Sequence, residues 1–396
     1  MIDAIAAGHL CVDIIPQITD PAVATSASFL APGRLTEVGG AILSTGGSVS
    51  NTGLALHRLG LEVRLVARLG DDAIAGITRD LLARRDPRLT AHLAVAHGEP
   101  SSYTIVINPP GVDRTFLHCP GTNNTFGPED LPVELLAETR LLHLGYPPLM
   151  RRMYADGGEE LAALLCRAKE AGATTSLDMA MPDPAGPSGR ADWRGLLARV
   201  LPHVDVFQPN AEELLFMLHR RRLEELQRAP EGVLDALAPA EISALAGEAL
   251  AMGARMVAIK LGHRGFFLST ASPLGDMGRG APTDPYAWSG RELWAPCFRV
   301  QVVGTVGAGD ATSAGLITGL LRGQPAEEAL TSAVAVGACN VEAADATSGV
   351  RSWEETQRRV AAGWERLDAR VNAEGWRWDA AAGLYRGPMD NWRHLP

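Results

Sequence analysis

Residues 302–321 read VVGTVGAGDATSAGLITGLL. An apolar stretch, which we interpret as a strand, runs into the loop Gly307-Ala308-Gly309-Asp310, and a helix is expected to follow it. Glycine lets the backbone approach a ligand closely, and the first turn of a helix offers unpaired N–H groups and the positive end of the helix dipole. This order of elements therefore predicts an anion site, for which phosphate is the commonest ligand.

Asp310 lies at the edge of this predicted anion site. A carboxylate beside a phosphate is electrostatically unfavourable unless it has a task, and taking a proton from an attacking hydroxyl is such a task. The alternative is a helix cap, a common place for Asp. The local residues leave both interpretations open. The loop matches neither GxxxxGK[ST] nor G-x-G-x-x-G, so neither a Walker loop nor a dinucleotide site is indicated.

A second glycine-rich segment, STGGSVSNTGLALHRLG, spans residues 44–60. Gly46 and Gly47 precede a predicted helix, and Asn51 lies on its first turn, where an amide side chain can donate to and accept from hydroxyls. The alternative is a plain glycine turn in which Ser48 or Ser50 caps the helix.

The surrounding sequence alternates strand-like and helix-like segments, which predicts a parallel sheet covered by helices. We expect one buried strand over Ile2–Ile15. Two stretches, about 16–45 and 91–118, break the alternation and favour short strands and turns, so they are expected to form a separate small β-layer. Five of the eight Trp residues follow residue 350, which is typical of a tail that docks by burying aromatic rings.

Composition excludes several classes of protein. The 396 residues are 46% hydrophobic and 21% charged, as in globular proteins. The net charge of −10 without a basic stripe argues against nucleic-acid binding. Five widely spaced cysteines favour free thiols over zinc or disulfides. Neither a signal peptide nor a long apolar run is visible, so we expect no membrane partner and a cytoplasmic protein.

Together, the two glycine-rich segments resemble the two signatures of the ribokinase/PfkB family of carbohydrate and nucleoside kinases. The resemblance covers about residues 2–370. Weaker matches follow in the order of the family: Asp13, Gly70-Asp71-Asp72 with Gly76, Arg114-Thr115-Phe116, Asn210-Ala211-Glu212-Glu213, and Lys260-Leu261-Gly262 with Gly265.

The resemblance implies a ribokinase-like three-layer α/β/α fold, with a mainly parallel central sheet and a small β-sheet lid. It implies a kinase domain over 1–370, with lid segments at about 16–45 and 91–118, and leaves 371–396 as a Trp-rich tail docked on that domain. The implied reaction transfers the γ-phosphoryl group of ATP, with Mg²⁺, to a hydroxyl of a sugar, sugar acid or nucleoside. A homodimer through the lid is a further expectation.

The resemblance also implies roles for individual residues. Asp310 resembles the general base, and the amides of Gly307, Ala308 and Gly309 resemble the anion hole for the transferred group. The substrate-binding candidates are Asp13, Gly47, Asn51 and Arg114. The nucleotide-binding candidates are Asn210, Lys260, Gly262, Gly265 and Thr305, and Glu213 is expected to hold Mg²⁺ through water.

Plainer interpretations stand beside these roles. Asp13 could be a turn residue at a strand end, Lys260 a charged strand end, and Arg114 a surface residue on a hairpin. Asn210 and Glu213 have the spacing of a capping box, which is compatible with a role near Mg²⁺.

Two positions depart from the family pattern. Gly304 stands where the family usually has an Asp associated with a monovalent cation, so the resemblance does not support potassium activation. Ser48 stands where ribokinase has Lys, so ribose specificity is not supported. A catalytically weak sugar or nucleotide sensor of the same fold and an unrelated nicotinamide-dependent enzyme are the alternatives.

Overall fold

The computed structural model describes residues 1–18, 32–33, 35–108 and 115–391. Within these residues a single large sheet has the order β14-β15-β13-β12-β11-β10-β9-β8-β1-β4-β5. Seven of its strands are mutually parallel: β1 (Ile2–Gly8), β4 (Val63–Leu69), β5 (His92–Val95), β8 (Thr139–Gly145), β9 (Thr174–Asp178), β10 (Val206–Phe207) and β11 (Met256–Lys260). Four antiparallel strands extend one edge: β12 (Phe266–Thr270), β13 (Glu292–Ala295), β15 (Leu384–Arg386) and β14 (Arg377–Asp379).

Helices cover both faces of this sheet, and each face has its own apolar core. The first layer contains α4 (Val133–Ala137), α5 (Arg151–Tyr154), α6 (Glu159–Glu170), α7 (Trp193–Val200), α8 (Ala211–Leu218), α9 (Arg220–Leu226), α10 (Val233–Ala236) and α11 (Pro239–Ala251). The second contains α2 (Ser48–Arg58), α3 (Ala73–Ala83), α13 (Ala308–Leu321), α14 (Ala326–Asn340) and α15 (Trp353–Ala361), with α12 (Pro285–Trp288) at the same side.

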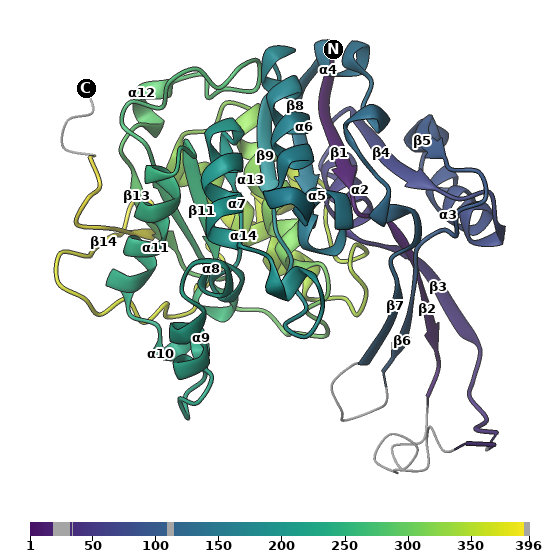
Figure 1. Ribbon diagram of the computed structural model, residues 1–396. Coiled ribbons are helices and arrows are strands. Elements are labelled where there is room, and N and C mark those ends of the chain that lie inside the picture. Colours follow the sequence, from purple (N-terminus) through teal and green to yellow (C-terminus); the bar gives the residue numbers. More distant parts are fainter. Residues whose placement is uncertain (19–31, 34, 109–114, 392–396) are drawn as a thin grey trace.

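Figure 1 shows α6, α7 and α11 in front of the sheet, with α13 and α14 behind it. This arrangement confirms the predicted fold class. Apolar periodicity explains the layers: α6 buries Leu161, Leu164, Leu165 and Ala168, which share one face of a helix. Among the described residues, no helix is long and apolar enough to cross a membrane.

A second, four-stranded sheet forms the lid and projects from one end of the body (Figure 1). Its order is β3 (Ala41–Gly46), β2 (Cys11–Pro16), β6 (Tyr103–Ile107) and β7 (Thr115–Cys119). The predicted small β-layer therefore exists. Its expected bounds were wrong at two places, because β5 belongs to the large sheet and β2 begins before residue 16. Residues 19–31, 34 and 109–114 of the expected lid lie outside the described residues.

The single strand expected over Ile2–Ile15 is wrong, because the chain leaves the large sheet after β1 and enters the lid as β2. Gly8 makes this change of sheet possible. Its φ is +119°, and a Cβ at this position would lie 2.6 Å from the carbonyl oxygen of Gly145. Only glycine combines that backbone conformation with so close an approach to β8.

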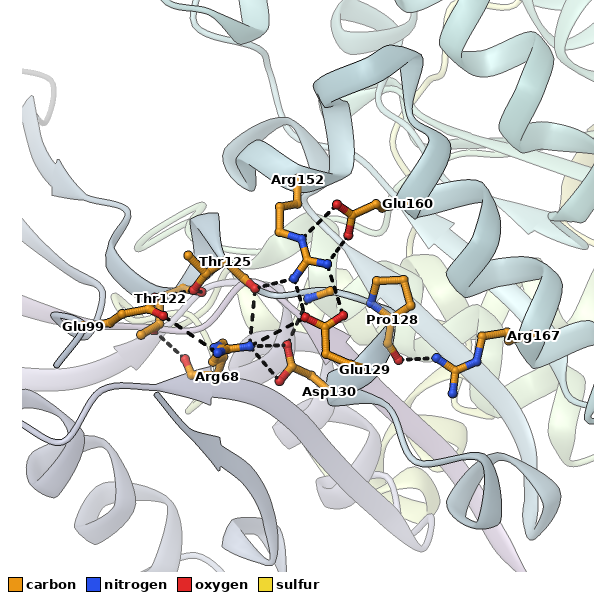
Figure 2. Close-up of polar contacts among 11 residues, drawn as sticks. Arg68, Glu99, Thr122, Thr125, Pro128, Glu129, Asp130, Arg152, Glu160 and Arg167 are labelled. Carbon is orange, nitrogen blue, oxygen red and sulfur yellow. Dashed lines mark hydrogen bonds and ion pairs between the residues drawn. The ribbon is translucent and has the colours of Figure 1, made fainter. Parts of the chain in front are cut away.

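The segment that returns from the lid to the body, residues 121–130, is held by arginines of the body (Figure 2). The guanidinium of Arg68 on β4 donates to Asp130 at 3.2 Å. The backbone oxygen of Arg68 accepts a hydrogen bond from the hydroxyl of Thr122 at 2.6 Å. Arg152 on α5 donates to Glu129, and Arg167 on α6 donates to the backbone oxygen of Pro128. The base of the lid is therefore tied to β4, α5 and α6.

The strand expected just before Gly307 is absent, and residues 301–306 are irregular. Val302 and Val303 are more than half exposed, and the amide of Val303 donates to the backbone oxygen of Val341 after α14, not to a strand. Beside β13 the sheet continues with β15, which comes from the tail. Trp376 packs edge-on against Trp294 of β13. The domain boundary at residue 370 stays a prediction.

Candidate active site

The candidate site lies at the carboxyl ends of the parallel strands, where ligands of open α/β sheets bind. Polar residues stand at or just after the ends of five neighbouring strands: His9 after β1, Tyr146 after β8, Asp178 at the end of β9, Asn210 after β10 and Lys260 at the end of β11. A cavity of about 470 Å³ opens there. Its lining includes Tyr146, Asn210, Glu213, Lys260, Gly262, Gly307, Gly309 and Asp310.

Asp310 is the third residue of α13 and is 2% exposed. The helix is capped by Gly307, whose φ is +69°, so the interpretation of Asp310 as a helix cap is wrong. Its carboxylate instead accepts hydrogen bonds from other elements. Asn51 Nδ2 donates to Oδ2 at 3.0 Å, the hydroxyl of Thr52 donates to Oδ1 at 3.1 Å, and the hydroxyl of Tyr146 donates to Oδ2 at 2.8 Å.

Burial and the neighbouring Asp178 carboxylate raise the pKa of Asp310, while Lys260 and the hydrogen bonds from Tyr146 and Asn51 lower it. The net direction is upward. A buried carboxylate with a raised pKa in a cavity is a stronger proton acceptor than an exposed one, which is the property of a general base.

Lys260 forms a buried ion pair with Asp178, with 2.5 Å between Nζ and Oδ1. The hydroxyl of Ser313 donates to the other oxygen of Asp178 at 3.2 Å. Burial opposes the ammonium charge, yet the carboxylates of Asp178, Glu213 and Asp310 hold the pKa of Lys260 above its ordinary value. The side chain of Lys260 is only 13% exposed and lines the cavity, so it is not a solvated strand end.

The glycine pair at the start of α2 brings this helix against the site. Gly47 caps α2 with a φ of +85°, and a Cβ there would lie 2.5 Å from Nδ1 of His9. No side chain caps α2, so the expected alternative of capping by Ser48 or Ser50 is wrong. Three buried atoms in this region have no partner among the described residues: Asn51 Oδ1, Ser48 Oγ and His9 Nδ1.

Asp13 lies within β2, so the turn interpretation is wrong for this residue. In the register of the lid it stands opposite Ser44 and Thr104, and Thr104 stands opposite His118. Opposed residues share one face of a sheet, so these four polar side chains form a row across the lid. Burial raises the pKa of Asp13. His118 contacts His9 of the body, with 3.3 Å between their Nε2 atoms.

Asn210 and Glu213 form the expected capping box of α8. Asn210 Oδ1 accepts from the amide of Glu213 at 2.7 Å, and Glu213 Oε2 accepts from the amide of Asn210 at 2.8 Å. Both residues also line the cavity. Burial is the main cause that raises the pKa of Glu213 to about 7.

The remaining candidate residues differ in whether they reach the cavity. Gly262 lines the cavity, whereas Gly265 turns the chain against β13, where a Cβ would lie 2.0 Å from the backbone oxygen of Ala295. Thr305 is exposed and accepts from the amide of Ala308 through its backbone oxygen. Arg114 lies outside the described residues. At Gly304 a Cβ would lie 2.9 Å from the backbone oxygens of Ala343 and Ala344.

Sequence reasoning missed Asp178, Tyr146 and Thr52. A usable signal existed for the first two, because each stands at the carboxyl end of a strand that the sequence does predict. For Thr52 there was none, since its hydroxyl meets Asp310 only through the packing of α2 against α13.

Comparisons with known proteins address the fold and the family of the chain. A sugar kinase of Archaeoglobus fulgidus, described as uncharacterised, is 26% identical over 273 residues, which is 68% of this chain and 88% of that protein. Ribokinase of Arabidopsis thaliana, solved with ribose and ATP, superposes with a TM-score of 0.67 at 18% identity and covers 90% of this chain and 98% of that one.

A ribokinase II of Escherichia coli, described as putative and solved with ATP and Mg²⁺, gives a TM-score of 0.64 at 19% identity, covering 91% of this chain and all of that one. These similarities show that the fold is ribokinase-like. The family model of the pfkB carbohydrate kinases matches residues 10–353. The chain therefore belongs to the pfkB family of carbohydrate kinases.

Proposed function

We propose that the protein transfers the γ-phosphoryl group of ATP to a hydroxyl of a sugar, sugar acid or nucleoside, with Asp310 as the general base. The observation that carries this proposal is the position of Asp310. Its buried carboxylate stands in the first turn of α13, beside Gly307 and Gly309, in a cavity that also contains Lys260. In this proposal a proton acceptor and an anion site share one cavity.

In this mechanism Asp310 takes the proton from the attacking hydroxyl as the new bond between its oxygen and the γ-phosphorus forms. The bond between the γ-phosphorus and the β–γ bridging oxygen breaks, and ADP leaves with its electron pair. The amides of Gly307, Ala308 and Gly309 would stabilise the negative charge of the transferred group, because the first amides of a helix have no partner within the helix. The amide of Ala308 would exchange its hydrogen bond to the backbone oxygen of Thr305, 3.3 Å long, for the phosphoryl oxygen. Phosphoryl transfer depends mostly on positioning and charge stabilisation, which these groups supply.

The residues present are compatible with Mg²⁺ held mainly by phosphate oxygens and water. Within the described residues no group of three or more His, Cys, Asp or Glu could hold a metal, so an all-protein cage is not available. Glu213 lines the cavity, and Asn210 stands beside it. One or two such ligands suffice for Mg²⁺ bound with a nucleotide. The metal would neutralise phosphate charge.

The acceptor side is supported by unpaired polar atoms. Buried polar atoms in folded proteins almost always have partners, so we propose Asn51 Oδ1, Ser48 Oγ and His9 Nδ1 as the atoms that bind hydroxyl groups of the acceptor. They lie at the turn formed by Gly46 and Gly47. The polar row of the lid that contains Asp13 would cover the acceptor and exclude water, which otherwise competes as a phosphoryl acceptor.

Lys260→Met is expected to lower kcat/KM for ATP by about 10²–10³, because the variant loses the ammonium group that faces the phosphates. It also leaves Asp178, which is fully buried, without its cation, so stability falls as well. The double variant Lys260→Met/Asp178→Asn separates the two effects. It is expected to recover the unfolding temperature but not the activity. A double variant with wild-type kcat/KM would contradict the role of Lys260.

We also propose a homodimer through the lid. Next along the strands of the lid to the polar row that contains Asp13, and on the opposite face of the sheet, lies a row of aliphatic residues. In this row Leu43 pairs with Ile14, Ile14 with Ile105, and Ile105 with Leu117. Leu43 and Leu117 are 41% and 49% exposed, which is unusual for aligned aliphatic residues on one face of a sheet.

Leu117→Asp is therefore expected to convert the dimer into a monomer, because a carboxylate on this face cannot be buried without a partner. Sedimentation velocity measures the change, with Val133→Asp as a control at an exposed apolar residue of the body. A wild-type protein that is already monomeric would contradict the proposed dimer.

A cytoplasmic location is part of the proposal. All five cysteines are free, which suits a reducing compartment.

The first test is ADP release from ATP·Mg²⁺ across sugars, sugar acids and nucleosides. At least one acceptor is expected to stimulate release strongly. Thermal shift with ATP·Mg²⁺ and with nicotinamide dinucleotides runs beside it, since a ligand of the native state raises the unfolding temperature. Binding of ATP without turnover on any acceptor would favour the sensor, and stabilisation by the dinucleotide alone would contradict a kinase.

A further inference from the structure

Tyr146 has an unusual backbone for a residue with a large side chain. It follows β8 directly and has φ +65° and ψ +43°, in the left-handed region. Such a conformation costs about 1–2 kcal/mol for a residue other than glycine. The conformation is fixed on both sides, by a hydrogen bond from its amide to the backbone oxygen of Asp178 at 3.2 Å and by Pro147 and Pro148. Strained residues of this kind cluster at functional sites. Of the non-glycine residues with positive φ in the described part of the chain (Tyr146, Asp156 and Arg370), Tyr146 alone lines the cavity.

The side chain of Tyr146 reaches the proposed base. Its hydroxyl donates to Oδ2 of Asp310 at 2.8 Å, and Asn51 donates to the same oxygen. Two donors occupy the two lone-pair directions of Oδ2. The other oxygen, Oδ1, accepts only from Thr52 among the hydrogen bonds of the described residues. One lone pair of Oδ1 is therefore available for an acceptor hydroxyl.

We infer that Tyr146 is a positioning residue for the proposed phosphoryl transfer, and that its hydroxyl fixes Oδ2 of Asp310 so that Oδ1 takes the proton of the acceptor. The inference rests on the proposed function of Asp310. It adds the residue that follows β8 to the two residues of α2 that hold the base, and it assigns a use to the strained turn after Gly145.

The charges around the pair support this role. Burial and the Asp310 carboxylate hold the pKa of Tyr146 well above its usual range, so the phenol stays a donor. Asp310 also faces Asp178 and Lys260 and interacts with Glu213, while the ring of His9 lies 6.1 Å from that of Tyr146. The hydrogen bond from Tyr146 lowers the pKa of Asp310 against burial and the charge of Asp178.

Tyr146→Phe tests the inference, because it removes the hydroxyl and keeps the ring. Asp310 works as a base only when it is ionised. Without the phenol its pKa rises, so the acidic limb of the kcat/KM profile is expected to move to higher pH. At a pH on this limb kcat is expected to fall about tenfold, the effect of losing one hydrogen bond to a charged group. KM for ATP is expected to stay the same.

Tyr154→Phe is the matched control, since Tyr154 packs against Trp193 outside the site. Thermal unfolding of both variants shows whether a loss of activity comes from a loss of structure. An acidic limb at the wild-type pH in Tyr146→Phe would overturn the inference, whatever its kcat. Absence of acceptor-dependent turnover in the wild type would instead overturn the proposed function itself, and the role of Tyr146 with it.

Discussion

Asp310→Asn is expected to lower kcat by about 10³ with the best acceptor, within the range of about 10²–10⁴ that general acid–base catalysis contributes. Asparagine keeps the size of the side chain but does not take a proton at neutral pH. It also brings an amide donor toward a position that already has three donors, from Asn51, Thr52 and Tyr146. Because the variant lacks the proton acceptor of the chemical step, the loss is expected in kcat, and the affinity for ATP is expected to change little.

The measurement compares steady-state kcat with ATP binding by calorimetry for the same preparation. Asp80→Asn is the matched control, since Asp80 is an exposed residue of α3, away from the cavity. A kcat within a few-fold of the wild type would show that Asp310 does not accept the proton. A parallel loss of ATP binding would show that the substitution disturbs the anion site instead.

Arg291→Met is expected to cause the largest loss of stability, because it removes the 0% exposed arginine of a charge cluster that also holds Asp390, Glu327 and Arg386. The Arg291 guanidinium is 0% exposed and donates to Asp390 at 2.8 Å, to Glu327 at 2.6 Å and to the backbone oxygen of Ala287 at 2.7 Å. Asp390 is equally buried and belongs to the tail. Removing one partner of a buried ion pair costs about 3–5 kcal/mol. Because Arg386 still pairs with Asp390 at 3.1 Å and with Glu327 at 3.0 Å in the variant, we expect the lower end of this range, about 3 kcal/mol.

This loss of about 3 kcal/mol corresponds to a fall in the unfolding midpoint of about 4 °C, given an unfolding entropy of about 2.1 cal/mol/K per residue over 396 residues. Arg299→Met is the control. Arg299 pairs with Glu365 at 2.9 Å, but both side chains are more than 60% exposed, so the midpoint is expected to change by no more than about 1 °C. Equal midpoints for the two variants would show that the tail does not depend on the buried cluster.

Local patterns were enough to predict much of the fold. Strand and helix periodicity predicted α6 and β9 because each element depends on its own residues and one buried face. The loop at Gly307 was predicted for the same reason, since the conformations that glycine permits are a local property. The family model over residues 10–353 agrees with the signatures read from these segments.

What the sequence could not supply depends on distant contacts. The break after Gly8 depends on the backbone of Gly145, which is 137 positions away in the chain. The stretch Val302–Val303 has the composition of a strand, but the amide of Val303 bonds to the backbone oxygen of Val341 after α14, a partner that the local sequence does not reveal. The donors to Asp310 come from α2 and from the turn after β8, so only the packed structure shows which side chains hold the carboxylate.

The most direct test of the proposed kinase activity is mass spectrometry of the reaction products, with ATP·Mg²⁺ and the acceptor that best stimulates ADP release. We expect a phosphorylated acceptor that accumulates one-to-one with ADP in the wild type and is absent with Asp310→Asn. ADP with inorganic phosphate and no phosphorylated acceptor, or equal product from Asp310→Asn, would contradict transfer to an acceptor hydroxyl by this base.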